Sequence, residues 1–311
     1  MKDGHVTVLL NEAVDALQPR AGGIYIDGTF GGGGHSRELL ERVSGDVTLY
    51  VIDADPDAIA RAEELRSSSL GHKVIPVHDN FRNLASISRE REIPPVDGLL
   101  FDLGLSSFQL DQAERGFAFR FDGPLDMRFD NTSGISAADL VNTASAEDLA
   151  DIFWRFGEEK QSRRIARSIV DRRSETPFES TADLAAVIER AIGGRRGRSI
   201  HPATRSFQAL RIAVNEELSA LEDVLQAAVD IMAPGGRLAV ISFHSLEDRI
   251  VKQFIAREIA TCICPPDVPV CVCHHSPRLK RIGKPIKPSA AEQANNIRSR
   301  SAIMRVAERL A

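Results

Sequence analysis

A run of four glycines, Gly31 to Gly34, stands between a short apolar segment at 24–26 and a helical pattern at 36–43. Each glycine adds conformational entropy to the unfolded chain, so such a run is costly unless the folded backbone has a use for it. A buried strand, a glycine-rich turn and a helix, in this order, form a cradle where backbone N–H groups at the helix N-terminus approach a ligand closely. The turn therefore predicts an α/β protein that binds a nucleotide-like cofactor at its first strand.

The residues around the turn narrow the kind of cofactor. The G-x-G-x-x-G pattern of dinucleotide-binding proteins is not met, because Phe30 and Ser36 stand where glycines are required, and no Walker-type Gly-Lys-Ser/Thr follows. Asp27 ends the first apolar segment, and Asp53 ends the next one. A carboxylate accepts two hydrogen bonds from a ribose diol, and an acidic pocket tolerates a sulfonium cation. The pattern therefore favours S-adenosylmethionine, a nucleoside that carries a sulfonium.

Strand and helix patterns alternate up to Leu103 and indicate a parallel sheet. This βαβ repeat is typical of a sheet that is covered by helices on both faces. We expect four strands in this part of the chain, at 24–26, 47–52, 74–77 and 96–103.

A helical insertion is expected after the fourth strand. From Gly104 to about Arg198 no strand pattern appears, and helical patterns at 146–154 and 161–173 take over. Ser245, with Asp248 three residues later, is expected to cap a helix near the C-terminal end of the chain. The remaining expected elements are a long helix at 207–232, strands at 237–243 and 302–307, and a loop at 262–288.

The charge of the chain is unevenly distributed. The formal net charge is −5, which by itself argues against a nucleic-acid partner. Residues 160–211, however, contain 12 Lys/Arg against 5 Asp/Glu, and residues 278–311 contain 9 against 2, so each stretch carries a net +7. Segregation of this kind can build a basic surface that attracts phosphate, although solvated helical faces are the more common outcome.

The four cysteines all lie between Cys262 and Cys273, which argues against a secreted disulfide framework. The chain also shows no apolar run of the ~20 residues that would span a bilayer and no signal peptide at Met1 to His5. We therefore expect a cytoplasmic protein without a membrane partner. A reduced, proline-rich hairpin without metal is the preferred interpretation of the cysteine stretch, and a zinc site is the alternative that its four thiolates leave open.

Several blocks of the chain resemble one family. The turn Asp27–Ser36, with the sequence DGTFGGGGHS, is similar to the cofactor loop of the RsmH (MraW) family, the bacterial small-subunit ribosomal RNA cytosine-N4 methyltransferases. Two positions depart from the family pattern: Gly32 stands where a basic residue is frequent, and Phe108 where proline is common. The other blocks that carry the resemblance, nearly from end to end, are His5–Val14, Asp102–Ser107, Gln109–Asp111, Glu114–Phe117, Asp122–Arg128, His201–Arg205, Phe207–Arg211 and Ile241–Arg249.

The resemblance implies a class I, Rossmann-like methyltransferase sheet with an inserted helical domain. Residues 1–104 and 205–311 would form the S-adenosylmethionine-dependent methyltransferase domain, and residues 105–204 the inserted substrate-recognition domain. The implied reaction is methyl transfer to the exocyclic N4 of one cytidine in the decoding region of 16S rRNA, with the small ribosomal subunit as the partner. The implied cofactor contacts are Gly33, Gly34, His35, Asp53, Phe81, Asp102 and Gln109.

The chemistry of N4 methylation gives a role to Asp102. The exocyclic amine of cytosine is a poor nucleophile because its lone pair is delocalised into the ring, so a hydrogen-bond acceptor is needed as the amine becomes pyramidal. Asp102 ends the fourth expected strand, at the edge where ligands bind open α/β sheets, although a turn-capping carboxylate is the alternative. Amino-methylases usually carry an Asp/Asn-Pro-Pro-aromatic segment at this place, which Asp102-Leu103-Gly104-Leu105 replaces here.

Ser106 and His244 complete the expected catalytic set. His244 follows the strand expected at 237–243 and could line a cytidine pocket with Ser242 and Ser245, although a lone histidine is more often structural. Ser106 belongs to the block that resembles the family just after Asp102. Methylation at carbon 5 is disfavoured, because it needs a cysteine nucleophile in the active site and the cysteines lie elsewhere.

Arg115, Arg205 and Arg211 are the residues expected to bind RNA. Arg205 and Arg211 approach the long helix that leads back into the sheet, and solvated helix arginines are the alternative interpretation. Arg115 lies beside the alternating aromatics Phe117, Phe119 and Phe121, which suit stacking on unpaired bases or, equally, a half-buried strand face. Phe81 has a similar ambiguity between stacking on adenine and ordinary core packing.

Other functions stay open at this point. A DNA or small-molecule methyltransferase shares the cofactor signature, and the composition does not separate DNA from RNA. A non-catalytic RNA-binding factor of ribosome assembly could keep the same fold. A homodimer is also considered, because nothing in the sequence sets the oligomeric state.

Overall fold

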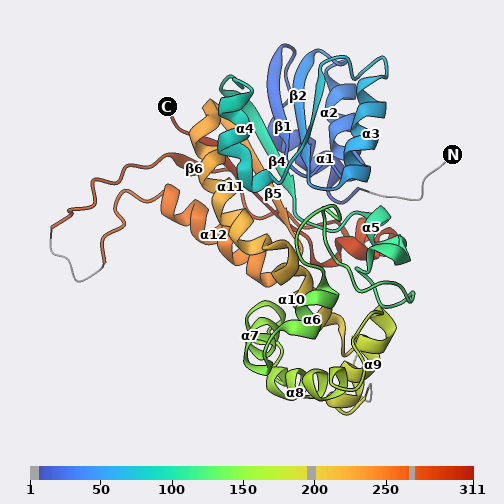
Figure 1. The fold of residues 1–311 in the computed structure, drawn as a ribbon. Helices are drawn as coiled ribbons and strands as arrows, with labels where there is room; N and C mark the ends of the chain where they lie inside the picture. The colour runs from blue at the N-terminus through green and yellow to red at the C-terminus, as the bar shows by residue number, and fades with distance from the viewer. Residues whose placement is uncertain (1–6, 195–200, 266–269) are drawn as a thin grey trace. The chain divides into compact units, whose positions relative to one another are not determined.

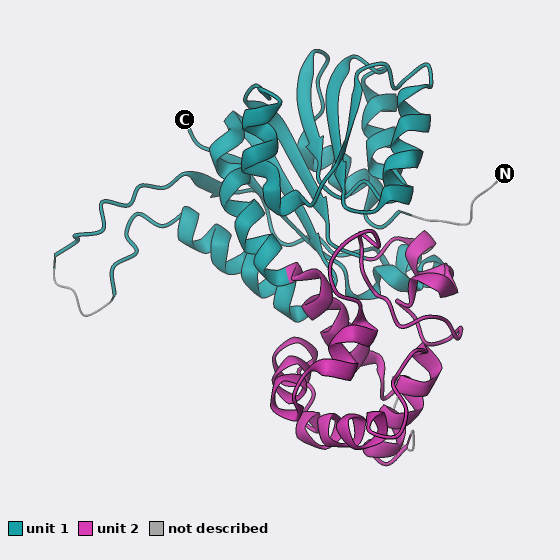
Figure 2. Ribbon diagram, viewed as in Figure 1, with its two compact units in different colours: residues 1–104, 218–311 teal, residues 105–217 magenta. Residues whose placement is uncertain are grey.

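The computed structural model describes residues 7–194, 201–265 and 270–311, so His5 and Val6 of the first resembling block lie outside it. The chain divides into two compact units (Figure 2). Unit 1 consists of residues 1–104 and 218–311, and unit 2 consists of residues 105–217.

Unit 1 contains a sheet of seven strands in the order β3-β2-β1-β4-β5-β7-β6 (Figure 1). The first five strands in this order run parallel, whereas β7 pairs antiparallel with both β5 and β6. The strands are β1 (Gly23–Asp27), β2 (Val47–Asp53), β3 (Val74–His78), β4 (Val96–Asp102), β5 (Met232–Ser242), β6 (Leu279–Arg281) and β7 (Ile303–Arg309).

Helices cover both faces of this sheet. Because successive side chains of a strand point to opposite faces, Leu99 and Phe101 of β4 join one apolar cluster while Leu100 joins the other. The first cluster includes residues of α4, α11 and α12, and the second includes residues of α1, α2 and α3. The predicted α/β fold is confirmed. The helical elements of the unit are α1 (Leu10–Leu17), α2 (Gly34–Arg42), α3 (Pro56–Arg66), η1 (Phe81–Asn83), α4 (Leu84–Glu90), α11 (Glu217–Ile231), α12 (Ser245–Glu258), α13 (Ala290–Asn295) and η3 (Ile297–Ser301).

Unit 2 is built from short helices around its own apolar core, in which Phe153, Ile165 and Leu210 are fully buried. Its helical elements are α5 (Ser107–Asp111), η2 (Ala113–Arg115), α6 (Ala137–Thr143), α7 (Ala146–Gly157), α8 (Ser162–Arg173), α9 (Thr181–Ala191) and α10 (Thr204–Asn215). The helical patterns expected at 146–154 and 161–173 correspond to α7 and α8. The unit extends to Glu217, beyond the end expected at residue 204, because α10 packs in its core through Phe207 and Leu210.

Three local expectations were wrong. The helix expected at 207–232 is broken at Glu216, whose φ of 50° lies in the left-handed region, so α10 and α11 are separate helices. The cap of α12 is His244 with Glu247, one residue before the expected Ser245 and Asp248. Strand β6 lies within the stretch 262–288 that was expected to be a loop.

Candidate functional site

The glycine turn joins β1 to α2 at the carboxyl end of the parallel strands. Gly33 has a φ of +73° and precedes the first residue of α2, a conformation that glycine adopts without strain. At Gly34, a Cβ atom would lie 1.9 Å from the Thr7 hydroxyl, so the absence of a side chain lets these two segments pack. The turn therefore needs glycine both for its conformation and for close approach.

Two carboxylates, the buried Asp27 and the half-buried Asp53, hold the turn in place. Asp27 accepts hydrogen bonds from the Ser36 hydroxyl at 2.6 Å and from the Thr29 backbone N–H at 3.2 Å. Asp53 accepts from the backbone N–H of Gly31 at 2.8 Å and of Asp55 at 2.9 Å. Burial raises the pKa of both Asp27 and Asp53 to about 6, against which these hydrogen bonds act. The three adjacent strands β1, β2 and β4 thus each end on an acidic residue beside the turn.

One oxygen of the Asp102 carboxyl group lacks a hydrogen-bond partner in the described part of the chain. Its Oδ1 is buried and has no hydrogen-bond partner among the described residues, whereas its backbone N–H donates to the Thr29 hydroxyl at 2.6 Å. Burial and then the nearby charge of Asp27 raise the pKa of Asp102 to about 7. A buried acceptor without a partner is costly, so this oxygen is suited to a ligand donor.

His35, the second residue of α2, lies beside Asp102. Its Nδ1 is 3.8 Å from Oδ2 of Asp102, and its Nε2 is 3.1 Å from the backbone carbonyl of Val8. The side chain is almost fully buried, with 6 % exposed. The predicted cofactor residues Gly33, Gly34, His35, Asp53 and Asp102 therefore all belong to this end of unit 1.

Phe81 lies at the start of η1, after β3. Its ring packs edge-to-face on Phe101 with centroids 5.9 Å apart, and the side chain remains partly exposed. Asn80 caps this turn by accepting a hydrogen bond from the backbone N–H of Arg82. Phe81 thus packs partly against the core through Phe101. Stacking of its ring on the adenine of the cofactor stays a prediction.

His244 and two serines line a hollow of about 520 Å³ past the end of β5. Ser242, His244 and Ser245, which were expected to act together, all line it. His244 also caps α12, since its Nδ1 accepts from the Glu247 backbone N–H at 3.4 Å and its Nε2 lies 3.0 Å from Glu247 Oε1. The Ser242 hydroxyl is buried and has no hydrogen-bond partner among the described residues. The remaining lining residues are Phe243, Asp248, Arg249, Lys252, Ser301 and Ile303.

Ser106 and Gln109 belong to unit 2, where they cap α5. The Ser106 hydroxyl accepts from the Gln109 backbone N–H at 3.2 Å, and Gln109 Oε1 accepts from the Ser106 N–H at 3.1 Å. This reciprocal pair satisfies the start of the helix. Both predicted roles, catalysis for Ser106 and cofactor binding for Gln109, therefore compete with a structural one.

Two of the three arginines expected to bind RNA are engaged inside unit 2. Arg115 is 5 % exposed, and its guanidinium donates to the carbonyls of Arg128 and Phe129 at 3.1 and 2.8 Å. Arg211 makes two hydrogen bonds to Glu217, at 2.7 and 2.8 Å, with both side chains largely buried. These contacts give Arg115 and Arg211 a structural role inside unit 2, and their binding of RNA stays a prediction. Arg205 is exposed and keeps its predicted role open.

The alternating aromatics are also mostly structural. Phe117 is buried and stacks on Phe129 with centroids 5.6 Å apart, and Phe119 packs against His201 and Phe207 at 4.5 and 4.8 Å. Phe121 is 50 % exposed, with the guanidinium of Arg120 4.9 Å from its ring centroid. No strand forms in this described segment, so core packing in irregular backbone explains the spacing.

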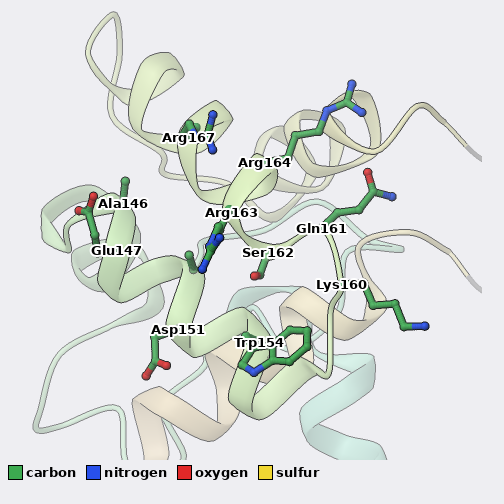
Figure 3. A pocket seen from close by; sticks show the side chains of 11 residues that line it. Ala146, Glu147, Asp151, Trp154, Lys160, Gln161, Ser162, Arg163, Arg164 and Arg167 are labelled. Carbon is green, nitrogen blue, oxygen red and sulfur yellow. The ribbon is translucent and has the colours of Figure 1, made fainter.

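A basic groove of about 880 Å³ lies between α7 and α8 of unit 2 (Figure 3). Trp154, which is 58 % exposed, comes from α7, and the cationic side chains come from α8 and the residues just before it. Ile165 and Ile169 fix the inner face of α8 in the core. The cationic side chains on the opposite face of α8 are therefore exposed to solvent. The cationic lining residues are Lys160, Arg163, Arg164 and Arg167, and the acidic ones are Glu147 and Asp151.

The sequence pattern alone did not single out these groove residues. They belong to the basic stretch 160–211, but its net charge gives no reason to prefer one arginine over another. The usable signal is the spacing of Arg163 and Arg167, which share one helical face opposite the apolar residues.

None of the helices in the described part of the chain is both long and apolar enough to cross a membrane.

Comparison with known proteins gives a consistent result. The sequence model of the MraW methylase family matches residues 2–310. The chain is 56 % identical over 308 residues to the ribosomal RNA small subunit methyltransferase H of Thermomicrobium roseum, covering 99 % of this chain and 94 % of that protein. The proteins of the same name from Dehalococcoides mccartyi and Carboxydothermus hydrogenoformans are 55 % and 50 % identical, covering 98 % and 100 % of this chain and 86 % and 99 % of those proteins.

Proposed function

Because the chain belongs to the MraW methylase family, we propose that it transfers a methyl group to the exocyclic N4 of a cytidine in the decoding region of 16S rRNA. The chain is a methyltransferase with S-adenosylmethionine as its cofactor and small-subunit ribosomal RNA as its substrate class. A cytoplasmic location, which we propose, is consistent with this substrate. The position on the base and the region of the RNA are the finer part of the proposal.

The residues of unit 1 fit the cofactor. Asp102 Oδ1 is a buried acceptor without a described partner, and Asp27, Asp53 and Asp102 make the end of the sheet acidic, as a sulfonium cation requires. Asp53 has a spare lone pair on each oxygen for a ribose diol, because each oxygen accepts one N–H from the described residues. The proposed contacts in unit 1 are Gly33, Gly34, His35, Asp53, Phe81 and Asp102.

The carboxyl group of Asp102 carries the proposal for the reaction. When bound, S-adenosylmethionine supplies an electrophilic methyl group on a good leaving group. Asp102 accepts a hydrogen bond from the amine at N4, which orients the lone pair and stabilises the positive charge that develops on nitrogen. Afterwards Asp102 holds the proton that N4 releases, which suits its pKa of about 7.

His35 and the hollow beside β5 support this role. With Nε2–H donating to Val8, Nδ1 of His35 faces Asp102 and limits the ways in which the carboxyl group can rotate. Ser242 and His244 line the hollow at the end of the neighbouring strand, and we assign them to cytidine binding. Ser106 caps α5. We propose that it also contacts the substrate.

The basic groove of unit 2 is proposed to bind the ribosomal RNA. None of its four cations forms an ion pair with another described residue, while Asp151 is paired with Arg155 at 3.2 Å. Cationic side chains around an exposed indole suit an unpaired base with flanking phosphates. Unit 1 would thus carry out the transfer and unit 2 recognise the RNA, together with the exposed Arg205.

Transfer of a tritiated methyl group tests the proposal. We expect label in 16S rRNA when the chain is incubated with small subunits that lack the modification, and digestion to nucleosides should give N4-methylated cytidine. Label in DNA, or at carbon 5 of cytosine, would overturn the assignment. Absence of transfer to any ribosomal substrate would favour a non-catalytic assembly factor.

A further inference from the structure

The four cysteines of the chain converge in the segment between α12 and β6, which projects from unit 1 (Figure 1). Their Sγ atoms all lie within 4.8 Å of one another, although Cys264 and Cys271 stand on opposite arms of the segment. The Sγ of Cys271 lies 3.5 Å from Cys262, 3.5 Å from Cys273 and 4.0 Å from Cys264, and Cys262 lies 3.8 Å from Cys273. All four are free, and these separations far exceed a disulfide bond of about 2.0 Å.

These separations are those of a tetrahedron of sulfurs around one metal ion. A zinc–thiolate bond of about 2.3 Å places the sulfurs of a tetrahedral site about 3.8 Å apart. The backbone also supports charged sulfur, because N–H groups donate to the Sγ atoms of three cysteines. These donors are Ile263 to Cys273, Cys264 to Cys262 and Val272 to Cys264, each at 3.4 Å. A hydrogen bond to the charged form of a group favours that form, and the thiolate is the form that binds metal.

We propose that Cys262, Cys264, Cys271 and Cys273 bind one zinc ion. Four sulfur ligands complete the tetrahedral coordination of zinc, so the site has no open position for a substrate and is structural rather than catalytic. Soft thiolates select zinc over magnesium or calcium, which prefer oxygen ligands. The alternative to this proposal is the metal-free, reduced hairpin that was expected from the sequence.

The surroundings of the cysteines explain why this segment needs a metal. At its base, Arg278 donates to Glu258 through both its backbone N–H (2.9 Å) and its guanidinium (2.6 Å). Beyond the base, the described residues 261–265 and 270–277 contain no helix or strand and make no backbone–backbone hydrogen bond with one another. Ile263 is 38 % exposed and Val272 is 66 % exposed, so no apolar core forms there either. A metal is one of the few ways in which so small an element is held in one conformation.

Metal analysis of the full chain tests the proposal. We expect one zinc per chain in protein purified under reducing conditions without a metal-binding tag. Removal with a strong chelator should raise the number of thiols that react with a disulfide reagent from near zero to four, since every cysteine belongs to the cluster. Cobalt added to the stripped protein should give the thiolate charge-transfer bands of a tetrahedral sulfur site.

Variants separate the four thiolates from adventitious binding. Cys262→Ser with Cys271→Ser should lose the zinc, whereas the matched control His274→Ala, beside Cys273 but outside the cluster, should keep it. Protein that carries no zinc, takes none up after reduction and shows four reactive thiols throughout would overturn the site, as would two disulfides in freshly isolated protein. The thiol count is measured on the unaltered protein, so it does not depend on whether the cysteine variants fold. None of these measurements uses methyl transfer, so the zinc site can fail or hold independently of the proposed function.

Discussion

Nδ1 of His35 lies 3.8 Å from Oδ2 of Asp102, while Nε2 of the same ring lies 3.1 Å from the carbonyl oxygen of Val8. A carbonyl only accepts, so Nε2 of His35 donates to Val8, and Nδ1 is the ring nitrogen that faces the carboxyl group. One residue of the glycine-rich segment thus connects helix α2 of the sheet unit to the acid at the end of β4.

Replacing Asp102 with asparagine, which has nearly the same shape but no charge, should greatly slow methyl transfer. For Asp102→Asn we expect kcat for methyl transfer to fall roughly 100-fold or more, because the amide no longer accepts as a charged group or holds the proton. The matched control is Asp223→Asn, an exposed acid on α11 with 59 % of its side chain accessible, which should keep full activity. Single-turnover transfer to small subunits measures both. A wild-type rate in the Asp102→Asn variant would remove this residue from the mechanism.

The pH profile should show the titration of the same acid. Burial raises the pKa of Asp102 to about 7, and its ionised form is the better acceptor. We therefore expect kcat/KM to increase as the pH rises from about 6 to about 8 and to level off above it. In Asp102→Asn the residual activity should lack this step. A profile that is flat over this range in the wild type would contradict the assignment.

Stability should change with pH in the opposite direction. A folded-state pKa that is raised above the ordinary value of an acid favours the protonated form, so its stabilising contribution is present at low pH and lost as the pH rises through the folded pKa. The ligand-free protein should accordingly be less stable at about pH 8 than at about pH 5. Relative to the wild type, Asp102→Asn should gain about 3 kcal/mol more at pH 8 than at pH 5, because about two pKa units of the wild-type loss, at about 1.4 kcal/mol per unit, fall between these pH values. Urea unfolding at the two pH values measures the difference.

The role of the hollow beside β5 can be tested by replacing two buried serines, Ser242 as the test and Ser299 as the control. The Ser242 hydroxyl has no partner among the described residues, so Ser242→Ala should leave the free energy of unfolding unchanged or raise it by about 1 kcal/mol. Ser299 donates to the Asn296 carbonyl at 2.8 Å, and Ser299→Ala should cost about 1 kcal/mol. Methyl transfer should respond the other way, with kcat/KM for the RNA reduced only by Ser242→Ala. Unchanged transfer in that variant would exclude the hollow from substrate binding.

The groove of unit 2 should bind RNA by stacking and by charge. Trp154→Ala should weaken binding of a single-stranded segment roughly 5- to 100-fold, as expected for about 1–3 kcal/mol per stacked base. Arg163→Ala with Arg167→Ala should make the slope of log K against log salt shallower by about one for each phosphate that is no longer neutralised. Arg190→Ala, an exposed arginine on α9 outside the groove, is the control. If Trp154→Ala binds RNA normally but no longer binds a ribosomal protein, the groove serves a protein partner instead.

The part of the site that the sequence predicts is the part that regular structure dictates. Asp27, Asp53 and Asp102 each end an apolar run, and the carboxyl ends of parallel strands must meet at one edge of the sheet. The glycine turn could be placed for the same reason. Periodicity and strand ends were sufficient for this much, without any knowledge of tertiary contacts.

The rest depends on contacts between residues far apart in the chain. The burial of Arg115 results from carbonyls at positions 128 and 129 in irregular backbone, which no local pattern indicates. The left-handed residue Glu216, which separates α10 from α11, is not distinguished by composition from its helical neighbours. Strand β6 has three residues and exists through pairing with β7, so its own sequence is too short to predict it.

The position of unit 2 within the chain has an evolutionary consequence. The chain leaves the sheet at Gly104, just after β4, and re-enters it through α11 and β5, the strand that pairs with β4. The insertion therefore interrupts a crossover connection rather than a strand pair, and lengthening such a connection costs only about 0.6 kcal/mol for each doubling. The sequence of unit 2 can therefore change without disturbing the register of β4 and β5.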